Sequence, residues 1–509
     1  MNYKALGRIL GKIMILEGGL MLAPLIVGLI YREPIMNIVG FIIPIVALVG
    51  IGFLLQIPKP KRTSLYQKEG FALVAMVWIV MALFGALPFV ISNDIEGFTY
   101  VDACFEIMSG FTTTGASVIA DITQVSHSLL FWRSFSHWIG GMGILVFVLI
   151  FIPESNDGSS MHLLRAESPG PQVGKIASKM KVTARILYLI YLCLTVLEVI
   201  VLVCGPLIDY EMAAAAGHIV SENDKFFHAL LTAFGSAGTG GFGFIPNSME
   251  YFTPFAQYTI SIFLLIFGCN FALYYLILLG KIKEIFKSEE FRCYLIVIVT
   301  AVAIVFISLM TQYQQYGAAE AFRHALFQVT SIMTTTGYTT ANFDLWPQLA
   351  KTVLILLMFG GAMAGSTAGG IKLSRIVIAM KGTMVNIRKL INPRYVPKTK
   401  FEGKSLAEKT TNDVFAFITL YLFIILGSVL LLSFDPVNAN EGHGFFSNFS
   451  ASLACISNIG PGFEAVGPYL SYASYNLFSK IILTFVMLMG RLEILPVLIL
   501  FTPKTWKKV

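Results

Sequence analysis

The sequence predicts an all-α integral membrane protein in which two N-terminal helices precede four repeats of helix, re-entrant loop and helix. Three observations predict this fold: an apolar composition, ten apolar runs of membrane-spanning length, and a polar break ending in glycine that recurs four times. Hydrophobic residues make up 56% of the 509 residues and charged residues 13%. An ordinary soluble domain carries about 25% charged residues, so this composition indicates a membrane protein.

The apolar runs give the number and the start of the predicted spans. A spanning helix needs about 20 predominantly apolar residues. The first run follows Lys4, Arg8 and Lys12. It is longer than the core of a signal peptide and lacks a clear small-residue cleavage site, so we expect a retained helix. The ten runs are centred near residues 20, 46, 82, 140, 193, 268, 300, 363, 422 and 490.

The basic residues predict the orientation, because Lys and Arg are enriched in the cytoplasmic loops of membrane proteins. Alternate connections hold 29 of the 36 Lys and Arg residues. We therefore expect these connections, and with them both termini, to lie in the cytoplasm. The segments concerned are 1–12, 57–69, 153–185, 280–292, 372–409 and 503–509.

Cysteine and histidine patterns exclude the common kinds of catalytic and metal centre. The six cysteines show no CxxC spacing and lie mostly inside apolar runs, which is typical of packing residues. The seven histidines are scattered without an HExxH motif. The chain is therefore not expected to be an enzyme, and no covalent cofactor is expected.

The polar break is the feature that repeats. "TTTG" occurs at 112–115 and again at 334–337. The shared His-Ala-Leu of "FHALLTAFGSAGTGGFGF" (227–244) and "FRHALFQVTSIMTTTGYTT" (322–340) aligns Gly241 with Gly337 without a gap. Each break follows a short amphipathic stretch on the predicted outer side, which indicates a four-fold internal repeat. On this alignment the four breaks end at Gly115, Gly241, Gly337 and Gly460.

Irregular backbone at membrane depth is tolerated only where it is buried in protein or lines a water-filled cavity. Four such loops around one axis would present rings of carbonyl oxygens that replace the hydration shell of a monovalent cation. The alternative is that Gly and Thr are small residues at helix contacts, but four copies in frame favour a pseudo-four-fold pore. The candidate cation-binding residues are Thr113, Thr114, Gly115, Gly240, Gly241, Thr335, Thr336, Gly337, Asn458, Ile459 and Gly460.

The repeats divide the whole chain. The predicted units are the two N-terminal helices (1–69), repeat 1 (70–160), repeat 2 (161–285), repeat 3 (286–400) and repeat 4 (401–509). In contrast to the breaks, the glycines of "WIGGMGI" (138–144) are interpreted as packing residues that let helices approach closely.

With these motifs the chain resembles the superfamily of bacterial potassium transporters that includes TrkH and KtrB. The resemblance covers nearly the whole chain, and "IPKPKR" (57–62) and the two extra N-terminal helices look more like TrkH. Besides the four loops it rests on "RSFSHWIGGMGI" (133–144), "AGSTAGGIKLSR" (364–375) and "GRLEILPVLILF" (490–501).

The resemblance implies potassium uptake across the cell inner membrane through a filter whose backbone carbonyls bind the ion. It also implies a homodimer in lipid, with one pore per subunit, that associates with a cytosolic nucleotide-binding regulatory subunit similar to TrkA; nucleic acid is not an expected partner. Repeats 2 and 4 carry "GTGG" and "SNIG" where repeats 1 and 3 carry "TTTG". The filter cannot then be chemically four-fold. One glycine per repeat also offers fewer ordered carbonyl rings than the longer TVGYG filter of tetrameric channels, so we expect rubidium to pass well and sodium to be only partly excluded.

A second glycine-rich segment, "FGGAMAGSTAGGIKLSR" (359–375), interrupts an apolar run. Each glycine costs a helix interior about 1 kcal/mol relative to alanine. The segment is either a bent, tightly packed helix or, as the resemblance implies, an intramembrane gate loop at 360–370 that moves when the regulator acts on the basic segment 372–409. The candidate gate residues are Gly360, Gly361, Gly365, Ser366, Thr367, Gly369, Gly370 and Arg491.

Arg491 lies deep in the last apolar run, where an arginine costs about 2.5–3.5 kcal/mol on insertion scales. Glu493 is two positions on and points away from it on a helix. Arg491 therefore faces a water-filled cavity or loop carbonyls, or it pairs with a carboxylate on another helix such as Glu198. The resemblance places it near the pore below the filter, where its charge would hinder a passing cation.

Two questions stay open at this level. Asp121, Asp344 and Glu464 follow three of the glycines and either concentrate cations at an outer mouth or are ordinary loop charges. The chain could also be an ion-coupled secondary transporter, either a potassium symporter with protons or sodium or an alternating-access carrier of another substrate. Such carriers often have inverted repeats with discontinuous helices, whereas the loops here all lie on one side.

Overall fold

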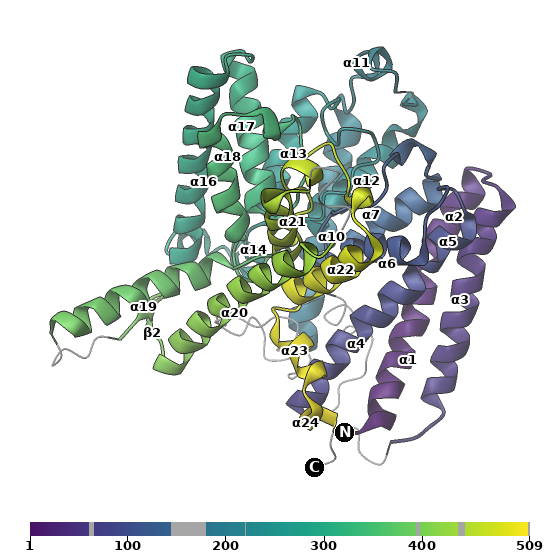
Figure 1. The fold of residues 1–509 in the computed structure, drawn as a ribbon, viewed down its shortest axis with the longest axis horizontal. Coiled ribbons are helices and arrows are strands. Elements are labelled where there is room, and N and C mark those ends of the chain that lie inside the picture. Colours follow the sequence, from purple (N-terminus) through teal and green to yellow (C-terminus); the bar gives the residue numbers. More distant parts are fainter. Residues whose placement is uncertain (61–65, 144–179, 219, 393–397, 436–442, 507–509) are drawn as a thin grey trace.

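The computed structural model describes residues 1–60, 66–143, 180–218, 220–392, 398–435 and 443–506 (Figure 1). In this part of the chain the secondary-structure elements are helices, apart from one hairpin of two strands with two residues each. Helix α1 (Tyr3–Leu20) continues as α2 (Leu22–Ile30), and α3 (Ile35–Gln56) returns beside α1 at one edge of the molecule. Several expectations fall wholly or partly outside the described residues. They are the segments 57–69, 153–185, 372–409 and 503–509, the boundary at residues 160 and 161, and the ends of "IPKPKR" and "RSFSHWIGGMGI".

Four repeats come next along the chain, each with a first helix, a short helix before the glycine and a second helix. The first helices are α4 (Gln67–Gly85) with α5 (Leu87–Ser92), α10 (Met180–Cys204), α16 (Glu289–Ser308) with the π-turn η3 (Leu309–Tyr313), and α20 (Glu408–Leu432). The short pore helices are α6 (Tyr100–Phe111), α12 (Lys225–Gly238), α17 (Ala318–Met333) and α21 (Phe445–Ser457). The second helices are α7 (His127–Gly141), α13 (Pro254–Phe267), α18 (Gln348–Phe359) and α22 (Leu477–Arg491).

The remaining elements connect or extend these helices. Beyond the second helices of repeats 2, 3 and 4 lie α14 (Phe271–Leu278), α19 (Leu373–Ile391) and α23 (Leu495–Phe501). Helices α19 and α20 extend together away from the body of the protein (Figure 1). The connecting segments hold α11 (Tyr210–Ala215), α15 (Ile282–Ile285), α24 (Pro503–Trp506), the hairpin strands β1 (Lys400–Phe401) and β2 (Lys404–Ser405), and the turns η1 (Ile122–Gln124), η2 (Glu222–Asp224), η4 (Phe343–Leu345), η6 (Glu464–Val466) and η7 (Tyr472–Ser474).

All four second helices stop after 12 to 15 residues. At 1.5 Å per residue this is about 18–22 Å, less than the roughly 30 Å of a hydrocarbon core. Glycines at two of these ends touch a pore helix: a Cβ added to Gly140 would lie 1.9 Å from the carbonyl oxygen of Phe111, and one added to Gly490 would lie 2.0 Å from that of Ile456. The packing interpretation of the glycines in "WIGGMGI" is therefore confirmed for Gly140.

The expected fold class is confirmed, but ten apolar runs do not give ten continuous spans. Six spans within the described residues are long and apolar enough to cross a membrane, and α13 with α14 makes a seventh that bends by 90°. Hydropathy detects a run of apolar residues and not whether its helix is continuous, so the second helices of repeats 1, 2 and 4 were expected to be complete. The break in repeat 3 was predicted from its glycines.

The buried side chains form two large clusters, and they interlock at the glycine loops. One cluster joins the N-terminal helices with repeats 1 and 2, and the other joins repeats 3 and 4. Tyr338 of repeat 3 packs in the first cluster, whereas Phe105 of repeat 1 packs in the second. Each of the two clusters thus includes a side chain from a repeat that belongs mainly to the other cluster.

Close contact between α1 and α3 yields a first prediction. A Cβ added to Gly52 would lie 2.7 Å from the carbonyl oxygen of Gly11, and one added to Gly11 would lie 2.5 Å from that of Gly52. Gly52→Val should lower the thermal unfolding midpoint in detergent, because overpacking costs about 1–3 kcal/mol. Gly50→Val is the matched control, since an added Cβ at Gly50 meets nothing within 4 Å. An equal midpoint for the two variants would contradict this packing.

Candidate functional site

The pore helices end where the glycine loops begin. We use "glycine loops" for residues 113–115, 239–241, 335–337 and 458–460. The last helical residues of α6, α12, α17 and α21 precede these loops directly or by one residue. A helix carries about half a negative charge at its C-terminus. Four C-termini that converge on one place therefore create a potential that favours a cation.

The backbone conformation of the glycine loops is the same in all four repeats. The first residue of each loop has a left-handed φ, and so has the glycine two positions on, a region that side chains with a Cβ rarely adopt. The φ angles of Thr113, Thr239, Thr335 and Asn458 are 55°, 55°, 56° and 55°, and those of Gly115, Gly241, Gly337 and Gly460 are 79°, 72°, 87° and 100°. The amides of the middle residues Thr114, Gly240, Thr336 and Ile459 donate to pore-helix carbonyls at 2.8, 2.9, 2.8 and 2.9 Å.

The glycines press against one another's loops in a closed ring. A Cβ added to Gly115 would lie 1.9 Å from the carbonyl oxygen of Gly240, which is the residue before the glycine of the next repeat. The same contact recurs around the ring: Gly241 to Thr336 at 2.0 Å, Gly337 to Ile459 at 1.9 Å, and Gly460 to Thr114 at 2.8 Å. The last contact returns to repeat 1, so the four loops enclose a common axis.

The structure brings together all eleven candidate cation-binding residues, and it adds one. Thr239 has the same φ as Thr113 and is fully buried like it. Aligning the four breaks on their glycines could have identified it. The loops nevertheless differ in side chain: Asn458 Nδ2 donates to Thr114 Oγ1 at 2.9 Å and to the Met487 carbonyl at 3.0 Å, so an amide stands where the other repeats have a hydroxyl.

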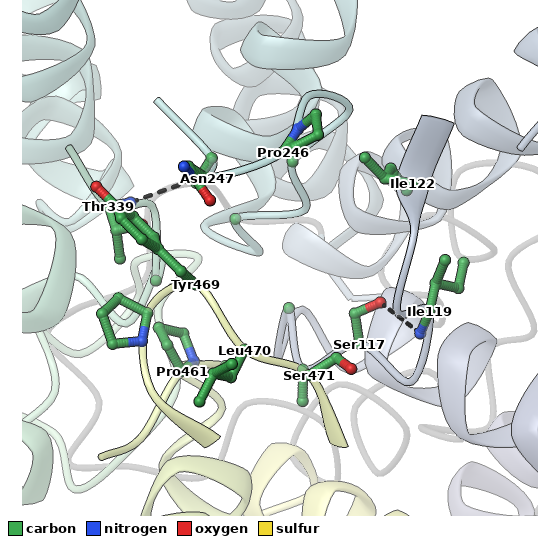
Figure 2. Close-up of a pocket in the computed structure, with 18 of the residues that line it drawn as sticks. Ser117, Ile119, Ile122, Pro246, Asn247, Thr339, Pro461, Tyr469, Leu470 and Ser471 are labelled. Atoms are coloured by element: carbon green, nitrogen blue, oxygen red, sulfur yellow. Dashed lines mark hydrogen bonds between the residues drawn. The ribbon is translucent and has the colours of Figure 1, made fainter. Parts of the chain in front are cut away.

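A cavity of about 400 Å³ lies against the glycine loops (Figure 2). All four glycines line it. Figure 2 shows Ser117, Asn247, Thr339 and Ser471 around it, one from the segment after each glycine. The ring is thus open to a vestibule on the side where these segments lie.

The three acidic residues that come after the glycines do not share one role. Asp121 lines the vestibule, whereas Asp344 and Glu464 are absent from its lining. Asp344 Oδ2 instead accepts the Glu464 amide at 2.6 Å, which ties repeat 3 to repeat 4. The Thr123 hydroxyl and amide donate to Asp121 and lower the pKa of its carboxyl, while burial raises the pKa of Asp344. Asp121 is therefore the one of the three carboxylates that lies at the entrance.

A buried ion pair supports the ring from behind. Arg133 Nε on α7 donates to Glu106 Oε1 on α6 at 2.7 Å, and the two side chains are 2% and 0% exposed. Glu106 Oε2 accepts the Val118 amide at 2.9 Å, and Arg133 Nη1 donates to the Gly243 carbonyl at 3.1 Å. The pair therefore fixes the segments that leave the glycines of repeats 1 and 2. Arg133 belongs to the motif "RSFSHWIGGMGI", but no role was predicted from the sequence for it or for Glu106.

The 360–370 loop contacts the other side of the ring. The Gly369 amide donates to Thr335 Oγ1 at 2.6 Å. A Cβ added to Gly369 would lie 2.5 Å from the Ser457 carbonyl oxygen and 2.8 Å from the Asn458 Cβ. The loop therefore touches the glycine loops of repeats 3 and 4 on the side away from the vestibule.

The other predicted gate residues hold the loop in shape. Gly360 pairs with Ile371 in a parallel bridge, and a Cβ added to Gly361 would lie 2.2 Å from the Gly369 carbonyl oxygen. The Gly365 carbonyl accepts the Phe271 amide at 3.0 Å, and Ser366 Oγ donates to the Met363 carbonyl at 2.7 Å. An added Cβ at Gly370 would lie 3.3 Å from Gly361, so both ends of the loop run side by side and the segment is no bent helix.

Arg491 contacts carbonyl groups on two repeats. Its Nη1 donates to the Thr367 carbonyl at 2.8 Å, and its Nη2 donates to the Gly141 carbonyl at 2.8 Å and to that of Gly140. Of the sequence alternatives, backbone carbonyls are therefore the ones observed, one in the 360–370 loop and two at the end of α7. Both carboxylate oxygens of Glu198 lack a hydrogen-bond partner within the described residues, so the suggested pair with Glu198 is not formed.

Glu493 has a different partner, as its spacing from Arg491 indicated. It pairs with Arg375 at the start of α19, and the Arg375 guanidinium carbon lies 4.1 Å from the centre of the Phe417 ring on α20. The segment after α22 is thereby joined to α19, which leaves the 360–370 loop, and Arg375 also joins α19 to α20.

The comparisons with known proteins agree with this geometry. The family model described as "TrkH: Cation transport protein" matches residues 36–508. The chain is 34% identical to the Trk system potassium uptake protein TrkH of Salmonella typhimurium (strain LT2) over 512 residues, covering 100% of both chains. It is 30% identical to the Trk system potassium uptake protein TrkG of Escherichia coli (strain K12) over 495 residues, covering 96% of this chain and 95% of that one.

A solved structure resembles the whole fold. The crystal structure of the potassium transporter TrkH from Vibrio parahaemolyticus matches with a TM-score of 0.83 and 31% identity, covering 100% of both chains. Family match, full-length similarity and fold all lead to one assignment. The chain belongs to the TrkH family of cation transport proteins.

Proposed function

We propose that this protein takes up potassium across the cell inner membrane through the ring of glycine loops. The observation that carries the proposal is the closed order of the ring, in which each glycine meets the carbonyl of the next repeat. Relatives across the full length of the chain are named potassium uptake proteins, which supports potassium as the ion.

In the proposed filter a potassium ion exchanges water for backbone carbonyl oxygens of the glycine loops. The negative ends of four pore helices and the Asp121 carboxylate attract the ion, whereas no charged side chain belongs to the loops themselves. One short loop per repeat offers few ordered oxygen layers, so rubidium passes well and sodium is excluded only in part. No bond is made or broken during passage.

The 360–370 loop is the proposed gate, and Arg491 holds it closed. The loop touches the inner side of the filter, and the Arg491 guanidinium bridges it to the interrupted helix of repeat 1. Opening requires the loop to leave Thr335 and Arg491. The bridging charge also repels a cation that leaves the filter.

We further propose that the protein acts as a homodimer with one pore per subunit, with both termini in the cytoplasm. A cytosolic nucleotide-binding regulatory subunit similar to TrkA then acts on the basic segment 372–409. Helices α19 and α20 support the proposed action of the regulator on this segment, because they extend out of the body beside the hairpin and carry basic residues.

Potassium symport with protons or sodium is the second candidate. Glu17 on α1 is fully buried, and its carboxylate oxygens have no hydrogen-bond partner within the described residues. An ionisable residue inside a membrane is a candidate functional site by default. Rubidium-86 uptake into proteoliposomes separates symport from passage through the filter alone. Symport would be favoured if a protonophore abolishes uptake by the wild-type protein and no longer affects uptake by the Glu17→Gln variant.

The filter predicts a loss of selectivity when a ring glycine gains a side chain. Gly337→Ser places a Cβ against the Ile459 carbonyl and should lower potassium-over-sodium selectivity about tenfold, as a loss of roughly 1.4 kcal/mol implies. Competition by potassium and sodium against rubidium-86 uptake measures it. Gly317→Ser is the matched control, because an added Cβ there meets nothing within 4 Å. A Gly337→Ser protein with wild-type selectivity would place the filter elsewhere.

The gate predicts faster flux when Arg491 is neutralised. Arg491→Ala removes the bridge to Thr367 and Gly141, and rubidium-86 flux should rise about tenfold if the barrier falls by roughly 1.4 kcal/mol. Arg388→Ala, at an exposed position of α19, is the control and should leave flux unchanged. Unchanged flux through a folded Arg491→Ala protein would contradict the gate, and its loss from the membrane would indicate a structural role instead.

The vestibule predicts a salt-dependent role for Asp121. Asp121→Asn should slow uptake about two- to threefold at low ionic strength and have no effect at high salt, where the charge is screened. Glu211→Gln, at an exposed outer position away from the cavity, should not slow it. Because hydrogen bonds lower the pKa of Asp121, its contribution persists as the pH falls through the usual aspartate range and disappears only below it. A salt-independent effect would argue against electrostatic attraction.

A further inference from the structure

The hairpin between α19 and α20 has an unusual turn. Strands β1 and β2 pair Phe401 with Lys404, and the two turn residues Glu402 and Gly403 have φ of 47° and 71°. Two left-handed residues make a type I′ turn, for which Asn-Gly or Gly-Gly is preferred. A glutamate in this conformation is strained. A strained residue is a reason to ask what its side chain does.

The Glu402 side chain reaches the first turn of α16. Its Oε1 accepts the Ser288 hydroxyl at 2.8 Å and the Glu290 amide at 3.0 Å. Glu402 thus satisfies a first-turn amide of α16, where a helix favours negative charge. The turn is held in place from below by Phe401, which is 4% exposed and packs with Ile378 and Val414.

The Glu290 side chain connects α16 to the proposed gate. Glu290, whose amide Glu402 accepts, is 2% exposed, and its Oε1 accepts the Ala364 amide at 2.8 Å and the Ser374 amide at 3.0 Å. Ala364 lies in the 360–370 loop, and Ser374 lies just beyond it in α19. One carboxylate oxygen therefore clasps both sides of the loop.

We infer that Glu402 is a positioning residue that transmits displacement of the β1–β2 hairpin through the first turn of α16 to the Glu290 clasp and the 360–370 loop. This rests on the proposed function, in which that loop is the gate and the segment 372–409 receives the regulator. The hairpin also touches α19 directly, because Lys381 donates to the Lys400 carbonyl at 3.1 Å and pairs with Glu289. The route through Glu402 is distinct, since it is the contact that reaches Glu290.

Amide hydrogen exchange of residues 360–375 in the full-length purified protein tests the inference without relying on transport. Glu402→Gly removes the carboxylate but supplies a residue that the turn prefers, so the hairpin persists. Exchange of the loop amides should become about tenfold faster, as expected when a hydrogen bond that holds it is lost. Glu402→Gln is the matched control, because its amide oxygen can still accept both bonds; it should restore exchange to near the wild-type rate. Glu290→Ala should remove the clasp, speed exchange of the loop amides and leave the hairpin amides at their wild-type rate.

The outcomes separate the relay from the gate. Faster loop exchange in Glu402→Gly, with rescue by Glu402→Gln, supports the inference whether or not flux changes. Rubidium-86 flux in the same variants then tests the proposed function: unchanged flux with a loosened loop would overturn the gate but not the relay. Loop exchange at the wild-type rate in Glu402→Gly, while hairpin exchange is also unchanged, would overturn the inference. Faster exchange confined to the hairpin would overturn it as well.

Discussion

The contact on which the rest of the structure depends is the one between each ring glycine and the carbonyl oxygen of the next repeat. With added Cβ atoms at 1.9 to 2.8 Å from those oxygens, no side chain fits at any of the four positions unless the neighbouring loop shifts. Because irregular backbone is tolerated at membrane depth only when it is enclosed by protein or lines a water-filled cavity, the surrounding elements serve to enclose it. Carbonyl groups of the pore helices accept hydrogen bonds from the loop amides. The Glu106–Arg133 pair fixes the segments that leave two of the loops. The interrupted second helices let glycines such as Gly140 and Gly490 pack against the ends of the pore helices.

On the side of the ring away from the vestibule, two charged side chains bind backbone groups of the 360–370 loop. Arg491 donates to carbonyls on two repeats, and Glu290 accepts two amides at the ends of the 360–370 loop. Breaking these hydrogen bonds would leave a charged group without its backbone partners, which costs free energy. In the proposed gate, the loop has to break these contacts to move.

The fold class, the four repeats and eleven residues of the glycine loops could be predicted from the sequence, because apolar runs and a glycine fixed in frame are local patterns. Thr239 was missed although the same alignment contains it, since "GTGG" does not resemble "TTTG" by letter. The break in the second helix of repeat 3 was predicted from its glycines, whereas those of repeats 1, 2 and 4 were missed because hydropathy averages over a break. The partners of Arg491, the Glu106–Arg133 pair and the different places of Asp121 and Asp344 could not be predicted, since they depend on contacts between residues more than twenty-five positions apart.

The most direct test of the account is to locate a potassium analogue in the protein. Crystals or membranes of the purified protein prepared in rubidium or thallium, which scatter strongly, would show where the ion sits. The account predicts density on the axis of the ring, at the level of the carbonyl oxygens of Thr114, Gly240, Thr336 and Ile459, that is displaced by potassium. Density beside Glu17 or Glu198, with none on the axis of an intact ring, would contradict it.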